Sequence, residues 1–170
     1  MNGKALMILP ETCTGCRLCE LACSARHDGI FSPSWSRVKV IKQDDASLDI
    51  PTVCLQCSKP VCADACTTGA LHRDHRTNAV VVDEDKCIGC RACITACPLG
   101  SISFDGEKGV AVKCDLCEGD PECARYCPTG ALQYVKAEAV GMIRKRIGAE
   151  RLSKAMRSVM APPPGSGRKA

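Results

Sequence analysis

Four cysteines between positions 87 and 97 stand at a spacing that suits one kind of chemistry. The stretch Cys87–Pro98 follows the pattern Cys-x2-Cys-x2-Cys-x3-Cys-Pro. The first three thiolates of such a run can lie on a tight loop around one face of a 4Fe-4S cubane. The fourth lies a helical turn further on and binds the other cluster of a two-cluster protein. One run of this kind therefore predicts another in the same chain.

Three further stretches repeat the pattern. Cys13–Cys23 has the same spacing with a serine in place of the proline, whereas Cys54–Cys66 and Cys114–Cys127 have longer intervals between the second and third thiols. Thr68–Leu71 and Thr129–Leu132 share the sequence Thr-Gly-Ala-Leu, a similarity independent of the cysteines. The four motifs use all 16 cysteines. We therefore predict four 4Fe-4S clusters, bound through iron, and no thiol remains for catalysis.

The composition favours metal over an ordinary core. Only 3% of the 170 residues are aromatic, which is little for filling a core. Residues 1–10 show no twin arginine and no cleavage site, and no apolar stretch approaches the roughly 20 residues of a membrane span. We therefore expect a cytoplasmic protein without a membrane span, where thiols bind metal more often than they pair. A disulfide scaffold and zinc sites are the alternatives, but zinc needs no fourth thiol three residues after a third.

The order of the motifs indicates which thiols share a cluster. One hairpin separates Cys66 from Cys87, as between the paired motifs of two-cluster ferredoxins, so the second and third motifs are predicted to pair. The first and fourth then pair as well. The rival scheme, first with second and third with fourth, needs the 31-residue step from Cys23 to Cys54 as a connection within a pair. The favoured clusters are Cys54, Cys57, Cys62 with Cys97; Cys87, Cys90, Cys93 with Cys66; Cys13, Cys16, Cys19 with Cys127; and Cys114, Cys117, Cys123 with Cys23.

The segments between the motifs predict an α+β fold of tandem ferredoxin-like modules, each with two 4Fe-4S clusters, short hairpins and short helices. Residues 4–10 read as a strand that ends at a proline, and alternation predicts a second strand over residues 36–42 that returns at 48–50. Apolar runs separated by polar turns predict two hairpins, one over residues 67–83 and one over residues 100–112. Residues 1–135 form the predicted four-cluster domain.

Side chains near the motifs have supporting roles in this interpretation. Thiols fill every cluster position, so His27, His72 and His75 are expected at the surface or behind the ligands. Gly15 and Gly89 are expected to let their loops approach the cubane closely and to donate backbone N–H groups to sulfur.

The order of the motifs, with an insertion in the second and a longer one in the fourth, resembles the four-cluster iron-sulfur subunit of molybdenum and tungsten oxidoreductases, the type found in dimethyl sulfoxide reductase. The resemblance covers residues 5–135. Among short members, the chain is most similar in size to the small polyferredoxin subunit of bacterial tungsten-dependent aldehyde oxidoreductases.

This resemblance implies a non-catalytic electron-transfer subunit of an oxidoreductase complex. It would relay single electrons between a large catalytic subunit with a molybdenum- or tungsten-bound pterin and a second redox partner, such as a flavin subunit or a ferredoxin. A free polyferredoxin or a redox-sensing iron-sulfur protein is the alternative. Self-association that extends the relay from copy to copy is a third hypothesis.

The C-terminal region differs in charge. Residues 1–135 hold 14 Lys and Arg against 17 Asp and Glu, a net −3, whereas residues 136–170 hold 9 against 2, a net +7. Apolar residues at mostly helical intervals predict a basic helical extension over residues 136–160, in which Gly148 is a position where the helix can break into two. This helix packs on its own core or docks on a partner, and no nucleic-acid partner is expected. Residues 161–170 are predicted to be a flexible tail.

Overall fold

Paired strands and short helices alternate along the chain. A computed structural model describes residues 3–46 and 48–160. The strands are β1 (Lys4–Ile8), β2 (Lys39–Gln43), β3 (Leu48–Thr52), β4 (Leu71–Arg73), β5 (Val80–Val82), β6 (Ile102–Asp105), β7 (Val110–Lys113) and β8 (Leu132–Lys136). The α-helices are α1 (Leu18–Asp28), α2 (Val61–Asp64), α3 (Ala92–Ala96), α4 (Glu122–Arg125) and α5 (Ala137–Met160). The predicted α+β class with a C-terminal helix is confirmed.

The strands pair in antiparallel twos: β1 with β8, β2 with β3, β4 with β5, and β6 with β7. The last three pairs are the predicted hairpins, with boundaries shifted by a few residues. The β1–β8 pair joins the two ends of the four-cluster domain, with Met7 opposite Gln133. The N–H of Leu9 extends this ladder by donating to the carbonyl of Ala131 at 2.8 Å.

Helix α1 is the longest of the helices that begin inside a cysteine motif. Proline ends the helical turn of the third and fourth motifs, because it has no N–H to donate and clashes with the preceding turn. In the first motif Ser24 takes this place, and α1 continues to Asp28. Its buried hydroxyl donates to the carbonyl of Leu21 at 3.2 Å and accepts from the N–H of Ser32 at 3.0 Å. The missing proline thus lengthens one motif into a helix of 11 residues.

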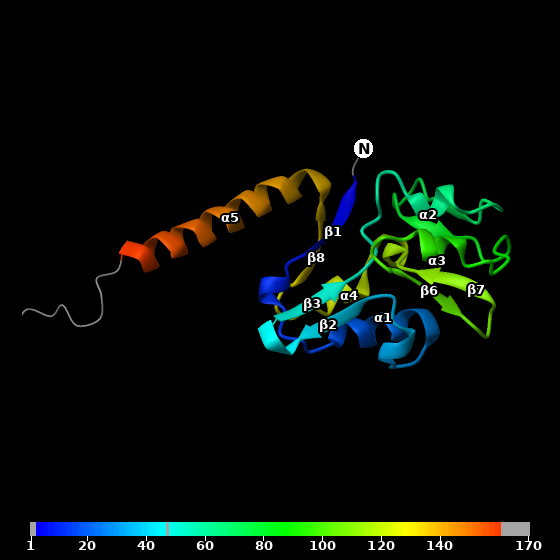
Figure 1. Cartoon of the computed structure of the whole chain (residues 1–170), viewed down its shortest axis with the longest axis horizontal. Coiled ribbons are helices and arrows are strands. Elements are labelled where there is room, and N and C mark those ends of the chain that lie inside the picture. Colours follow the sequence, from blue (N-terminus) through cyan, green and yellow to red (C-terminus); the bar gives the residue numbers. More distant parts are fainter. Residues whose placement is uncertain (1–2, 47, 161–170) are drawn as a thin grey trace, which may run out of the picture.

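The elements gather in two groups that interleave along the sequence (Figure 1). Helix α1 packs on α4, which belong to the first and fourth motifs, and α2 packs on α3, which belong to the second and third. One buried cluster includes Val38, Val40 and Leu132, and a second includes Leu71, Val80 and Ile102. Cysteines from the adjacent motifs belong to both buried clusters.

Helix α5 projects from the rest of the molecule (Figure 1). It contacts β1 and β8, and Arg151 Nη2 lies 2.5 Å from Glu11 Oε1. The break considered at Gly148 does not occur, because a single glycine costs only about 1 kcal/mol in a helix whose other residues favour it. The tail predicted over residues 161–170 lies outside the described residues. Among the helices that the structure describes, none has the length and apolar character needed to cross a membrane.

A leucine pair tests the core of the four-cluster domain. Leu132 is 1% exposed and Leu152 is 63% exposed. We expect Leu132→Ala to lower the free energy of unfolding by about 2–5 kcal/mol because it leaves a cavity. Leu152→Ala is the matched control and should change that free energy by less than about 0.5 kcal/mol. Anaerobic denaturant unfolding of the iron-loaded protein measures both, and equal losses would contradict the assigned core.

Candidate metal centres

The third cysteine of every motif is turned inward. Each of these four residues lies in a short helix and is buried, whereas the second cysteine is exposed in the first three motifs. The four inward residues are Cys19 in α1, Cys62 in α2, Cys93 in α3 and Cys123 in α4. Each motif therefore offers one thiol from a helix and others from the loop before it.

A repeated backbone conformation shapes these loops. The residue before the second cysteine has a positive φ in all four motifs: 65° at Gly15, 51° at Gln56, 68° at Gly89 and 62° at Leu116. Successive N–H groups around a left-handed residue form a concavity that favours anions, and many iron-sulfur sites use it. Glycine takes this conformation without strain, whereas Gln56 and Leu116 adopt it at a cost of about 1–3 kcal/mol each. That Gly15 and Gly89 donate to sulfur stays a prediction.

All sixteen thiols lie in the described part of the chain, and each is free. The structure brings thiols from different motifs together. Burial raises the pKa of Cys93, and the nearby thiolates of Cys66, Cys87 and Cys90 raise it further. Burial, the Glu20 carboxylate, and the thiolates of Cys127 and Cys16 likewise raise the pKa of Cys19 to about 12. The second motif thus meets the third, and the first meets the fourth.

One set of four thiols is entirely buried. Cys23, Cys114, Cys117 and Cys123 are each less than 9% exposed. Burial raises the pKa of Cys114 to about 12 and that of Cys117 to about 11, and it raises that of Cys123 further. The thiolates of Cys114, Cys23 and Cys117 add to the rise at Cys123. Near neutral pH these sulfurs bind protons until a cation displaces them, so the set fits a strongly bound metal with thiolate ligands.

The repeated Thr-Gly-Ala-Leu sequence has a structural role at the fourth cysteine. The Thr68 hydroxyl lies 3.6 Å from the sulfur of Cys66, and the Thr129 hydroxyl lies 3.8 Å from that of Cys127. Burial raises the pKa of each thiol, but hydrogen bonds from nearby backbone and threonine groups outweigh it and lower the pKa. The Leu132 N–H, 3.5 Å from the Cys127 sulfur, is one such donor.

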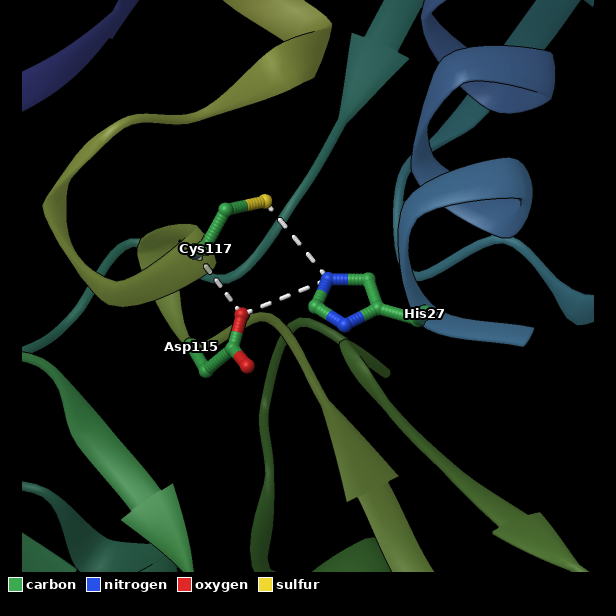
Figure 2. A group of neighbouring side chains, drawn as sticks. All are labelled: His27, Asp115 and Cys117. Carbon is green, nitrogen blue, oxygen red and sulfur yellow. Dashed lines mark hydrogen bonds and ion pairs between the residues drawn. The ribbon is translucent and has the colours of Figure 1, made fainter. Parts of the chain in front are cut away.

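A polar network encloses the buried thiols (Figure 2). His27 Nε2, from α1, lies 3.5 Å from the sulfur of Cys117 and 3.4 Å from Asp115 Oδ1. Arg37 donates from Nη1 to Asp115 Oδ2 at 3.0 Å and from its backbone N–H to the sulfur of Cys23 at 3.3 Å. Burial and the nearby Arg37 cation lower the pKa of His27. Near neutral pH its imidazole is therefore neutral, behind a ligand sulfur.

The sequence had limited power to find this network. His27 was one of three histidines expected at the surface or behind the ligands, and the structure places it behind a ligand while His72 and His75 are exposed. Asp115 and Arg37 were not singled out. Asp115 stands directly after a cysteine, but that position alone does not separate a buried carboxylate from a solvated one.

Sixteen free thiols on short helices and hairpins fit four 4Fe-4S clusters, and they define an iron-sulfur protein of the ferredoxin type. The family model of the 4Fe-4S dicluster domain matches residues 46–137, and the chain belongs to this family. A second model, of a 4Fe-4S binding domain, matches residues 10–26.

Similar proteins include subunits of several oxidoreductases. The polyferredoxin-like subunit of the aliphatic sulfonate oxidoreductase of Pyrococcus furiosus is 45% identical over 64% of this chain and 62% of its own length. One chain of the anaerobic dimethyl sulfoxide reductase of Escherichia coli is 37% identical over 60% and 55%. The iron-sulfur subunit of the arsenate respiratory reductase of a Shewanella species is 36% identical over 56% and 42%. The chain thus spans about two fifths to three fifths of the length of these relatives.

A glycine pair tests the fit of the loops around the thiols. Both Gly89 and Gly69 have φ near +68°. A Cβ at Gly89 would lie 2.5 Å from the backbone oxygen of Gly109, whereas one at Gly69 would meet nothing within 4 Å. Both alanine variants pay the left-handed strain of about 1–2 kcal/mol, but only Gly89→Ala must also displace backbone.

We therefore expect Gly89→Ala to lose more stability than Gly69→Ala, by about 1–3 kcal/mol, and to bind less iron. Iron content per chain and anaerobic denaturant unfolding measure the two effects. Equal behaviour of the two variants would show that the close approach to Gly109 does not constrain the loop.

Proposed function

We propose that this chain is an electron-transfer subunit of an oxidoreductase complex and has no catalytic role of its own. The observation that carries the proposal is the presence of sixteen free thiols in four repeated motifs, with none left over. The relatives that are named as iron-sulfur or polyferredoxin-like subunits support it. Its catalytic partner would be a large subunit with a molybdenum- or tungsten-bound pterin, in its most specific form a tungsten aldehyde oxidoreductase. A flavin subunit or a ferredoxin would be the second redox partner.

The proposed cluster sites follow the pairing of second with third motif and first with fourth. Their ligand sets are Cys54, Cys57, Cys62 and Cys97; Cys66, Cys87, Cys90 and Cys93; Cys13, Cys16, Cys19 and Cys127; and Cys23, Cys114, Cys117 and Cys123. The proximity of Cys66 to Cys93, of Cys127 to Cys19 and of Cys23 to Cys123 supports this grouping over the rival.

The burial of the thiols supports the same grouping. The set with Cys23 contains four buried thiols, and each of the other three contains one buried, one exposed and two half-buried thiols. The rival scheme would give Cys23 to the second motif and Cys97 to the fourth, and so would mix half-buried with fully buried thiols in the interior set.

A bound 4Fe-4S cluster accepts and releases one electron at a time. The side chains of this chain supply the surroundings that tune such a group. Leu116 keeps water from the buried thiols, since it is 2% exposed and packs among Cys19, Cys114 and Cys123. Backbone N–H groups of Arg37 and Leu132 donate to ligand sulfurs, which stabilises their negative charge. The proposal places the chain in a reducing compartment, which we expect to be the cytoplasm.

Paired cysteine variants test the grouping. We expect the unmodified chain, purified without oxygen, to contain about 16 iron and 16 acid-labile sulfide. The double variant Cys66→Ala with Cys93→Ala removes two ligands of one proposed cluster and should lose about four iron. The variant Cys66→Ala with Cys62→Ala touches two clusters and should lose about eight. The rival grouping predicts about eight for both variants, and zinc in place of iron would end the proposal.

Purification of the intact chain from its host tests the partner. We expect a stable large subunit that contains molybdenum or tungsten to purify with it in equal amount, because relatives of this kind are named as parts of oxidoreductases. Elemental analysis of the purified complex and light scattering measure metal and stoichiometry. A single chain without a partner would favour the free polyferredoxin, and several copies per particle would favour self-association instead.

A further inference from the structure

Lys113 is a buried lysine at the end of β7, directly before Cys114. It is 3% exposed, and its ammonium nitrogen donates to the carbonyl oxygens of Val80 and of Cys114, the latter at 3.0 Å. The amide oxygen of Gln56 lies 3.5 Å away as a third acceptor. Three acceptors match the three N–H groups of a charged ammonium.

No carboxylate neutralises this charge. Among the residues that the structure describes, no Asp or Glu oxygen lies within 4.0 Å of the Lys113 nitrogen, and its hydrogen-bond partners are uncharged. A buried charge without a counter-charge is costly, because the interior solvates it poorly. The retention of a lysine here therefore requires negative charge nearby from another source.

The nearby acidic groups are ligand thiols from two different sets. Burial raises the pKa of Cys62 and of Cys114, and the charge of Lys113 opposes that rise at both. Cys62 belongs to the second motif and Cys114 to the fourth. The lysine therefore lies between one cluster site of each proposed pair.

Gln56 joins the same two loops. Its backbone is left-handed, with φ 51°, and its side chain donates to the Cys114 carbonyl at 2.8 Å while it accepts from the Val80 N–H at 2.8 Å. The loop between Cys54 and Cys57 is thus hydrogen-bonded directly to the first cysteine of the fourth motif. Lys113 and Gln56 together form the junction between the two pairs of motifs.

We propose that Lys113 is a shared counter-charge for the two clusters that meet at this junction, and that it raises the reduction potential of both. The proposal rests on the proposed grouping of the cysteines. Reduction adds one electron, and so one negative charge, to a cluster that is already anionic with its four thiolates. A fixed ammonium beside two such sites favours the reduced form of each, so Lys113 makes the crossing between the pairs the easier place for an electron to reside.

The repeats provide a matched control. Lys86 stands directly before Cys87, the same place in the third motif that Lys113 has in the fourth. Its side chain is 61% exposed, and its nitrogen lies 2.6 Å from Asp83 Oδ2. Solvent and a carboxylate already compensate its charge. The two lysines therefore differ in burial and pairing while they share a position in the motif.

Potentiometric titration followed by electron paramagnetic resonance tests the proposal on the full chain. Iron and sulfide counts first establish that each variant holds four clusters. In Lys113→Gln we expect the equilibrium constant for reduction to fall about tenfold, which is about 59 mV, at two of the four clusters. Lys86→Gln should leave all four potentials within about 10 mV of the unmodified chain. No shift in Lys113→Gln, or an equal shift at all four clusters, would overturn the proposal while the grouping stands.

A second variant covers the case in which Lys113→Gln does not bind four clusters. Gln56→Glu keeps lysine and places a carboxylate beside it, so the same two potentials should fall. Unchanged potentials in a fully loaded Gln56→Glu protein would overturn the role of the charge. Fewer than four clusters in the unmodified chain would overturn the proposed function, and this inference with it.

Discussion

The fold depends on the burial of cysteine sulfur. Both buried clusters of side chains are built around cysteines, including Cys19, Cys114 and Cys123 in one and Cys62 and Cys93 in the other. Burial raises the pKa of these thiols, so without metal they pack as small, neutral, weakly polar groups. As ligands they carry charge that the metal compensates. A chain with 3% aromatic residues thus obtains much of its core from its ligands, and metal binding and folding stability become closely linked properties.

The spacing of the cysteines predicted much of this arrangement, because it constrains the backbone locally. Four motifs, the short helices inside them and the hairpins between them follow from residues that are close in sequence. Long-range relations were harder to predict. The partner of β1 is β8, at the opposite end of the domain, and His27 meets Cys117 across 90 residues. Lys113 and Lys86 cannot be told apart by their place in the motif, because burial arises from tertiary packing that the local sequence does not encode.

Helix α5 shows a related limit. The periodicity of its apolar residues correctly predicted a helix and identified the residues that share a face, but it could not tell whether another element covers that face. In the described chain, Met142, Leu152, Met156 and Val159 are exposed. Contact is with β1, β8 and Glu11. The basic extension, with its net +7 against −3 for the rest, is therefore held to the acidic domain over part of its length only.

The fourth motif departs most from the repeat, and this departure sets the character of the interior site. Its long interval forms a 3-10 turn over Leu116–Gly119, in which Cys117 and Glu118 have φ 46° and 59°. The Asp115 side chain accepts from the Cys117 N–H at 2.9 Å and fixes this turn, and Arg37 and His27 in turn fix Asp115. The second cysteine, exposed in the other motifs, is buried here. An insertion that lengthens a loop thus moves a ligand into the core, and three of the proposed sites keep an exposed thiol while the fourth, beside Lys113, has none.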